Sequence, residues 1–209
     1  MGIVANKMAV ELLIRFADKI KCKQKIQLRC KYKQKRKLMK AEDVSQKSRM
    51  AQQMFLNSSI YKNSKTIMLY MPLGNETDTS DILKSAFKDG KCVVLPVTDK
   101  QSGIITPVIA TKDTAYKKGA FSVTEPQSDT LVDVPQIDVI LVPGIAFDKR
   151  GSRIGFGKGC YDMLLDNAKA IKVGYCYDFQ VIRKIPCEKH DIKMAYIVTE
   201  NKITECKKY

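Results

Sequence analysis

Several residue types are scarce in this sequence, and each scarcity excludes a class of site. The 209 residues contain no tryptophan and one histidine, His190. The seven cysteines are odd in number and form no C-x-x-C pair. Structural zinc sites draw on closely spaced Cys and His ligands, so we expect no zinc site. The same spacing, with no apolar signal peptide before it, favours reduced thiols in the cytoplasm over a disulfide framework.

Long apolar runs are also missing. The best stretch, residues 138–147, falls short of the roughly 20 apolar residues that a membrane span requires. We therefore expect no membrane-spanning segment. With 44% hydrophobic and 28% charged residues, the composition is typical of a globular protein with a sizeable core. The length favours one domain, because domains cluster at about 100–200 residues.

Positive charge is abundant but unevenly placed. The formal net charge is +15, and residues 1–40 contain thirteen Lys and Arg against only Glu11 and Asp18. A net charge of +11 therefore lies in this block, and +4 lies in the remaining 169 residues. Such a block is compatible with nucleic-acid binding, with organelle targeting, or with the solvated face of a helix that handles an anionic ligand.

The basic block has a helical pattern. Apolar residues recur at helical spacing over residues 8–20, and the pattern continues through Ile26 and Leu28, which predicts a long basic N-terminal helix. Transit peptides are rich in Arg and Ser, whereas this segment is rich in Lys. Organelle import is therefore the weaker interpretation, and it stays open.

Further along the chain the apolar period alternates between helix and strand. A second helix is expected to begin near Asp43, with Gln46 in a capping-box-like position, and another covers residues 80–90. Apolar runs predict strands at residues 66–71, 92–97, 104–109, 139–142, 171–175 and 195–198. This alternation predicts an α/β fold with a mostly parallel sheet flanked by helices. Ligands of such folds collect at the carboxyl ends of the strands.

Residues 143–165 carry the strongest signal for chemistry. They follow a predicted strand and precede a helix expected to begin at Cys160 or Tyr161. Glycines let backbone N–H groups approach a phosphate, and neighbouring cations neutralise it. The segment interleaves both types: Arg150, Gly151, Arg153, Gly155, Gly157, Lys158 and Gly159. Its spacing fits neither a Walker A loop nor a dinucleotide fingerprint. The alternative is an irregular surface loop whose glycines serve turns.

These residues resemble a known family. The pattern P-G-x-A-F-D-x-x-G-x-R-x-G-x-G-x-G-x-Y-D over residues 143–162 is similar to the signature of the 5-formyltetrahydrofolate cyclo-ligase family. The resemblance covers roughly residues 20–200 and includes, in the family's order, Lys25, Arg29, Ser48-Arg49, Asn75-Glu76-x-x-Thr79, Glu125-Pro126, Gln180, Pro186 and His190-Asp191. It implies a sheet of the sugar-phosphate isomerase or CoA-transferase kind. It divides the chain into an N-terminal extension of unknown role, residues 1–20, and one α/β domain, residues 21–209.

The resemblance also implies a reaction, ATP-dependent conversion of 5-formyltetrahydrofolate to 5,10-methenyltetrahydrofolate with release of ADP and phosphate. ATP is then a co-substrate and Mg²⁺ the cofactor. A monomer is expected, with no nucleic-acid or membrane partner. The basic N-terminus would favour capture of polyglutamylated folates.

Site roles follow from the resemblance, residue by residue. Lys158 and Arg153 would be catalytic, by neutralising charge on the transferred phosphate, and Asp162 and Asp191 would hold Mg²⁺. Glu76, Met71 and Tyr161 would bind the folate. His190 is given no catalytic role, because a lone histidine is more often structural. The ATP site would comprise Lys25, Arg29, Arg153, Gly155, Phe156, Gly157, Lys158, Gly159 and Tyr161.

The sequence departs from the family pattern at two points, and two alternative functions stay open. Cys160 stands where the family usually has a tyrosine, and the N-terminus is longer than is typical. A nucleic-acid-binding protein would explain residues 1–40 but leave the glycine segment without a role. A sugar-phosphate isomerase or CoA-transferase relative would fit the predicted fold, and ATP-independent turnover would reveal it.

Overall fold

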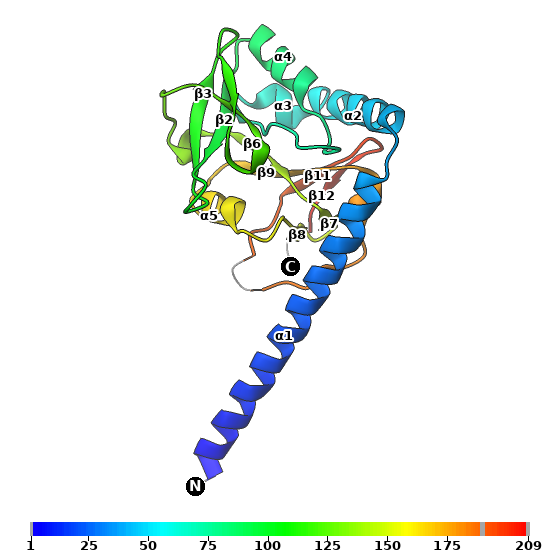
Figure 1. The fold of residues 1–209 in the computed structure, drawn as a ribbon, viewed down its shortest axis with the longest axis vertical. Coiled ribbons are helices and arrows are strands. Elements are labelled where there is room, and N and C mark those ends of the chain that lie inside the picture. The colour runs from blue at the N-terminus through cyan, green and yellow to red at the C-terminus, as the bar shows by residue number, and fades with distance from the viewer. Residues whose placement is uncertain (1, 189–190, 208–209) are drawn as a thin grey trace.

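A seven-stranded sheet forms the centre of the computed structural model, which describes residues 2–188 and 191–207 (Figure 1). The five inner strands are parallel, and each edge strand is antiparallel to its neighbour. The predicted α/β fold with a mostly parallel sheet is therefore confirmed. In spatial order the strands are β12 (Ile203–Glu205), β11 (Tyr196–Val198), β9 (Ile171–Tyr175), β6 (Val139–Pro143), β1 (Thr66–Met68), β2 (Cys92–Thr98) and β3 (Ile105–Ala110).

Alternating side chains of the inner strands enter two separate cores, one on each face of the sheet. Ile67 packs with α2 (Ala41–Leu56), α3 (Ser59–Asn63) and α4 (Ser80–Lys88), whereas Met68 packs with α5 (Cys160–Asp166) on the other face. Figure 1 shows α2, α3 and α4 together on one side of the sheet and α5 apart from them. Both faces are covered, which explains why the inner strands are apolar throughout.

The long basic helix is present as α1 (Gly2–Lys37), and it continues through residue 20 without a break. Its C-terminal part lies against the body through Leu28 and Tyr32, which pack on a small core containing Ile145, Ile154 and Ile185. Its N-terminal part projects away from the sheet (Figure 1). None of the helices in the described part of the chain has the length and apolar character of a membrane span.

Two local predictions differ from the structure. The second helix begins at Ala41, and no side chain caps it, so the capping-box prediction at Asp43 and Gln46 is wrong. Glu42 and Asp43 lie in its first turn, where carboxylates favour the helix dipole without capping it. The strand predicted at residues 66–71 ends at Met68, because the chain leaves the sheet there to enter the cavity described below.

Short elements that the sequence analysis did not predict surround the main sheet. Two of them, β7 (Ala146–Asp148) and β8 (Arg153–Ile154), fall inside the glycine-rich segment and pair with each other. β7 also pairs with β10 (Val181–Ile182), which gives the order β10-β7-β8. The others are β4 (Tyr116–Lys118) paired with β5 (Thr124–Pro126), and the 3₁₀ turns η1 (Ala120–Ser122), η2 (Val134–Gln136) and η3 (Asp178–Gln180). With two or three residues per strand or turn, these elements carry too little apolar period to be read from sequence.

The strand order reverses direction at β1. The chain runs from β1 to β2 on one side and later returns to β6 on the other side of β1. Loops leaving the carboxyl ends of β1 and β6 therefore diverge, and such a switch point is where open α/β sheets bind ligands. His190 lies outside the described residues.

Candidate functional site

A cavity of about 590 Å³ opens at the carboxyl ends of β1, β2 and β6. It draws on α1, the β1 loop, the glycine-rich segment and the segment before β11. All of the site residues predicted from sequence line it: Lys25, Arg29, Met71, Glu76, Arg153, Gly155, Phe156, Gly157, Lys158, Gly159, Tyr161, Asp162 and Asp191. The structure thus brings together residues from four separate stretches of the chain.

Helix α1 supplies one wall of the cavity. Lys25 Nζ lies 2.7 Å from Asp191 Oδ2 and 3.4 Å from Glu188 Oε1. Burial lowers the pKa of Lys25, but the hydrogen bond and charge of Asp191, together with Glu188, outweigh it and raise the pKa above its ordinary value. One turn further, Arg29 Nε donates to the carbonyl oxygen of Gly155 at 2.9 Å. The helix is thereby joined to the glycine-rich segment.

Glu76, which lines the cavity, belongs to a buried ion pair with Arg36. Glu76 is 5% exposed and Arg36 is 8% exposed, and their Oε1 and Nη1 atoms are 3.3 Å apart. The second oxygen of Glu76 accepts a hydrogen bond from the Leu73 backbone N–H at 3.0 Å. Burial raises the pKa of Glu76, and the Arg36 guanidinium opposes that rise. A charged acceptor at this depth fits a ligand that presents N–H donors.

The glycine-rich segment covers another side of the cavity and keeps its backbone accessible. Gly157 and Gly159 have φ angles of 98° and 71°, in the left-handed region that favours glycine. A Cβ atom on Gly157 would lie 3.4 Å from the Arg29 guanidinium, so the two segments pack closely. Lys158 is exposed, and its Nζ lies 3.6 Å from the centre of the Phe121 ring. No carboxylate among the described residues pairs with it.

Arg153 is held rigidly yet keeps an unused donor. Its side chain is 6% exposed, and it pairs with Asp162 at 2.8 Å and donates to the Pro143 carbonyl at 3.3 Å. Its Nε is buried and has no hydrogen-bond partner within the described residues. A buried polar group without a partner is costly, so this atom indicates an acceptor supplied by a ligand. The Tyr161 ring centre lies 5.7 Å from the same guanidinium, and burial raises the pKa of the Tyr161 hydroxyl.

The two aspartates proposed for Mg²⁺ lie in this cavity, each already beside a cation. Asp162 pairs with Arg153, and Asp191 pairs with Lys25. The described residues contain no cluster of three or more candidate ligands. Mg²⁺ is commonly held by one or two carboxylates together with phosphate oxygens and waters, so this donor set fits it in type and number.

Arg36, the partner of Glu76, is not among the residues predicted from sequence. The basic run at residues 31–37 concealed it, because most of its neighbours are solvated. A helical-spacing argument would have found it: Lys25, Arg29 and Arg36 lie four and seven residues apart, which places them on one face of a helix. Phe121, in a turn far along the chain, gave no signal.

Comparison with known proteins gives the same assignment. The profile of the 5-formyltetrahydrofolate cyclo-ligase family matches residues 21–200. The mouse 5-formyltetrahydrofolate cyclo-ligase is 28% identical over 187 residues, covering 83% of this chain and 92% of the mouse protein. The Escherichia coli K12 protein of the same name is 31% identical over 146 residues, covering 67% of this chain and 80% of that protein.

A solved structure shares the fold. The NMR structure of Aquifex aeolicus 5,10-methenyltetrahydrofolate synthetase superposes with a TM-score of 0.79 at 32% identity, covering 88% of this chain and 94% of that one. The family profile begins where α1 starts to approach the cavity and ends after β11, so the matched part includes every residue of the candidate site. The chain therefore belongs to the 5-formyltetrahydrofolate cyclo-ligase family.

Proposed function

We propose that this chain catalyses the ATP-dependent conversion of 5-formyltetrahydrofolate to 5,10-methenyltetrahydrofolate, with release of ADP and phosphate. The observation that carries the proposal is a single cavity that joins a cation-bearing glycine segment to a buried carboxylate at the switch point of the sheet. The first feature suits a nucleotide phosphate and the second suits a pterin, so one site accepts both substrates.

The reaction needs activation of a poor leaving group. The oxygen of an N-formyl group does not depart readily. Transfer of the ATP γ-phosphoryl group to that oxygen makes it a good leaving group, and N10 of the folate then attacks the activated carbon. Phosphate departs after the ring closes. The protein's contribution is positioning and charge stabilisation, as in other phosphoryl transfers.

The phosphate end of the site is assigned to the glycine segment and α1. Gly155, Gly157 and Gly159 present backbone to the nucleotide, and Phe156 and Tyr161 complete its surroundings. Lys158 and Arg153 neutralise charge on the transferred phosphoryl group. Lys158 has no carboxylate partner within the described residues, and Arg153 has an unused Nε, so each has a donor available for that task. Lys25 and Arg29 hold the nucleotide from the helix side.

Asp162 and Asp191 are the proposed Mg²⁺ ligands. Bound Mg²⁺ would neutralise phosphate charge and orient the nucleotide. Asp162 is fixed by its ion pair with Arg153, and Asp191 by its ion pair with Lys25, so each carboxylate lies beside a cation. This arrangement suits a metal–phosphate complex, because the carboxylates would hold the metal while the cations would neutralise phosphate oxygens.

The folate end of the site is assigned to Glu76, Met71 and Tyr161. Glu76 would accept hydrogen bonds from the pterin amino and ring N–H groups, and the other two side chains would pack on the ring. Burial raises the pKa of Glu76, and the Arg36 guanidinium opposes that rise and so favours the ionised form, which is an acceptor. Polyglutamylated folates would be favoured further by the basic N-terminal helix. We expect a cytoplasmic monomer.

One spectrophotometric assay tests the proposed function. Purified protein is mixed with 5-formyltetrahydrofolate, ATP and Mg²⁺, and the absorbance of the methenyl product is followed. Parallel reactions omit ATP or contain excess chelator, and neither should form the methenyl product. An equal rate without nucleotide would contradict a cyclo-ligase and favour an isomerase-like activity. Binding of an oligonucleotide with a steep salt dependence, and none of folate, would favour a nucleic-acid-binding protein.

A further inference from the structure

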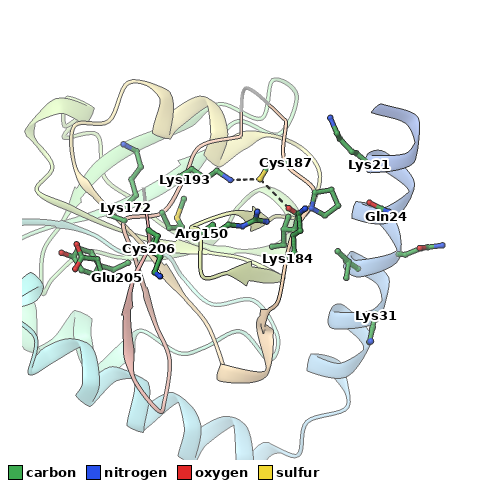
Figure 2. A pocket seen from close by; sticks show the side chains of 18 of the residues that line it. Lys21, Gln24, Lys31, Arg150, Lys172, Lys184, Cys187, Lys193, Glu205 and Cys206 are labelled. Atoms are coloured by element: carbon green, nitrogen blue, oxygen red, sulfur yellow. Dashed lines mark hydrogen bonds between the residues drawn. The ribbon is translucent and has the colours of Figure 1, made fainter. Parts of the chain in front are cut away.

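A second cavity, of about 2190 Å³, lies on another side of the α1 contact (Figure 2). Figure 2 shows Lys21, Gln24 and Lys31 of α1 facing Arg150, Lys184, Cys187 and Lys193 of the body. Its charged lining is almost entirely cationic, and Glu205 is the one carboxylate residue among the described residues that line it. Partly exposed cysteines in electropositive surroundings are the reactive class of cysteine, so Cys187 is the notable group here.

Cys187 and Lys193 are unusually close. Lys193 Nζ lies 2.6 Å from Cys187 Sγ. Ordinary N–H···O hydrogen bonds span about 2.7–3.2 Å, and sulfur is a larger acceptor than oxygen. The N···S separation is therefore too short for a relaxed hydrogen bond and too long for a direct N–S bond. A single oxygen atom bonded to both would hold them about this far apart.

The surrounding contacts hold this pair in place. Ser152 is 1% exposed, and its Oγ lies 2.7 Å from Lys193 Nζ and 2.9 Å from Cys187 Sγ. The Met194 backbone N–H donates to the Gly151 carbonyl at 2.8 Å, and the Ile185 backbone N–H donates to Asp148 at 2.8 Å. Ile185, before Cys187, and Met194, after Lys193, are thus both anchored to the turn that carries Ser152.

The lysine has no competing ion pair. No carboxylate lies within ion-pair distance of Lys193 among residues 2–188 and 191–207. Its Nζ contacts are the Cys187 thiol and the Ser152 hydroxyl. Lys193 is exposed, and Cys187 is half-buried in the wall of the open cavity. Small oxidants and reductants can reach both atoms.

We propose that Cys187 and Lys193 form a reversible covalent N–O–S bridge, with molecular oxygen as the oxidant. The S–H bond and one N–H bond break, and S–O and N–O bonds form. Sulfur and nitrogen each lose two electrons, and these four electrons reduce O₂ to the bridging oxygen and one water. The ammonium form of the lysine also releases one proton. A thiol reductant returns four electrons and restores the thiol, the amine and a second water.

The bridge would have a local structural consequence. It closes a ring that contains Glu188 and Asp191, whose carboxylates lie 3.4 and 2.7 Å from Lys25 on α1. Oxidation would therefore restrain Glu188 and Asp191, which line the candidate functional site and pair with Lys25 of α1. The modification itself does not depend on the proposed function.

Mass spectrometry of the full chain tests the bridge. Protein reduced under anaerobic conditions is divided, and one half is exposed to air-saturated buffer. The aerated half should gain the mass of one oxygen minus two hydrogens, and tandem spectra should place the link between Cys187 and Lys193. Dithiothreitol should reverse the gain. Cys187→Ser and Lys193→Arg should each abolish it, whereas Cys30→Ser, which removes an exposed cysteine on α1, should keep it.

Other masses would overturn the proposal. A gain of one oxygen without loss of hydrogen would mean a sulfenic acid, and a loss of two hydrogens alone would mean a disulfide, for example with Cys206 in the same cavity. An unchanged mass, or an undiminished gain in a folded Lys193→Arg variant, would also end it. Thermal melts establish that each variant folds. If either variant fails to fold, the tandem spectra of the wild-type chain decide the question alone.

Discussion

Helix α1 and the glycine-rich segment bring cations to the same cavity in opposite ways. The helix cations already have partners: Lys25 pairs with Asp191, Arg36 pairs with Glu76, and Arg29 donates to Gly155. In the glycine segment, Lys158 is exposed and lacks a carboxylate partner within the described residues, and Arg153, although paired with Asp162, keeps an Nε without a partner there. Paired cations stabilise the fold and shape the site, whereas available ones can meet charge that appears during reaction.

The largest effect should come from breaking the buried helix pair. Arg36→Ala leaves Glu76 buried without its counter-ion, and removal of one partner of such a pair costs about 3–5 kcal/mol. For a chain of this size the melting temperature should fall by on the order of 10 °C. The matched control is Lys37→Ala, an exposed neighbour whose loss should change stability by less than about 0.5 kcal/mol. Equal melting temperatures for the two variants would show that the pair is not structural.

The largest loss of catalytic rate is expected from a substitution in the glycine segment, although its free-energy cost is smaller than that of Arg36→Ala. Lys158→Ala should lower kcat by on the order of 10²- to 10³-fold, about 2.7–4 kcal/mol, because a donor aimed at transition-state charge is removed. Stability should hardly change, since the side chain is exposed. Steady-state kinetics and a melting curve measure both quantities. A near-wild-type kcat would remove Lys158 from the catalytic group, and Lys149→Ala is a suitable control for the loss of a nearby loop charge.

Glu76→Gln should act on binding more than on rate. Gln keeps the shape and can still accept from the Leu73 N–H, but it loses a charged acceptor worth roughly 1.5–3 kcal/mol. The KM for 5-formyltetrahydrofolate should rise by on the order of 10- to 100-fold, with the KM for ATP nearly constant. Because Gln also leaves the buried Arg36 without its counter-ion, stability should fall as well, so the two substrates are varied in turn after folding is established. A rise in the ATP KM alone would reverse the assignment of the two ends of the cavity.

The smallest effect should follow removal of residues 1–20. The cavity-lining residues of α1 begin at Cys22, and Phe16 is 65% exposed, so the missing turns contribute little to the site. Turnover of the monoglutamate substrate should stay within about twofold, since surface changes of this kind are usually within ±0.5 kcal/mol. Removal of residues 1–29 is the contrasting truncation, because it also deletes Lys25 and Arg29. Loss of activity in the shorter truncation would make the first 20 residues part of the domain.

Several features were predictable because they depend on local pattern. The helical spacing in residues 8–28 predicted α1, and the apolar runs at 92–97, 139–142 and 171–175 gave β2, β6 and β9 to within about a residue. The glycine segment was recognisable because its residue types and spacing carry the phosphate-binding chemistry themselves. The capping box failed because α2 begins at Ala41, two residues before Asp43, so the N-cap position falls on Lys40, whose side chain does not cap the helix.

The sequence by itself determined the family, the α/β class and the set of residues available for phosphate and folate. Tertiary structure alone decided how those residues are paired. Arg36 pairs with Glu76, which lies 40 positions later in the chain. Lys193 contacts both Cys187 and Ser152, and Ser152 lies 41 positions before Lys193. Neither contact leaves a periodic trace in the sequence, because burial and partner choice depend on which loops leave neighbouring strands at the same edge of the sheet. The physical reason is that local propensity acts over a few residues, whereas pairing of buried charges is set by packing of the whole fold.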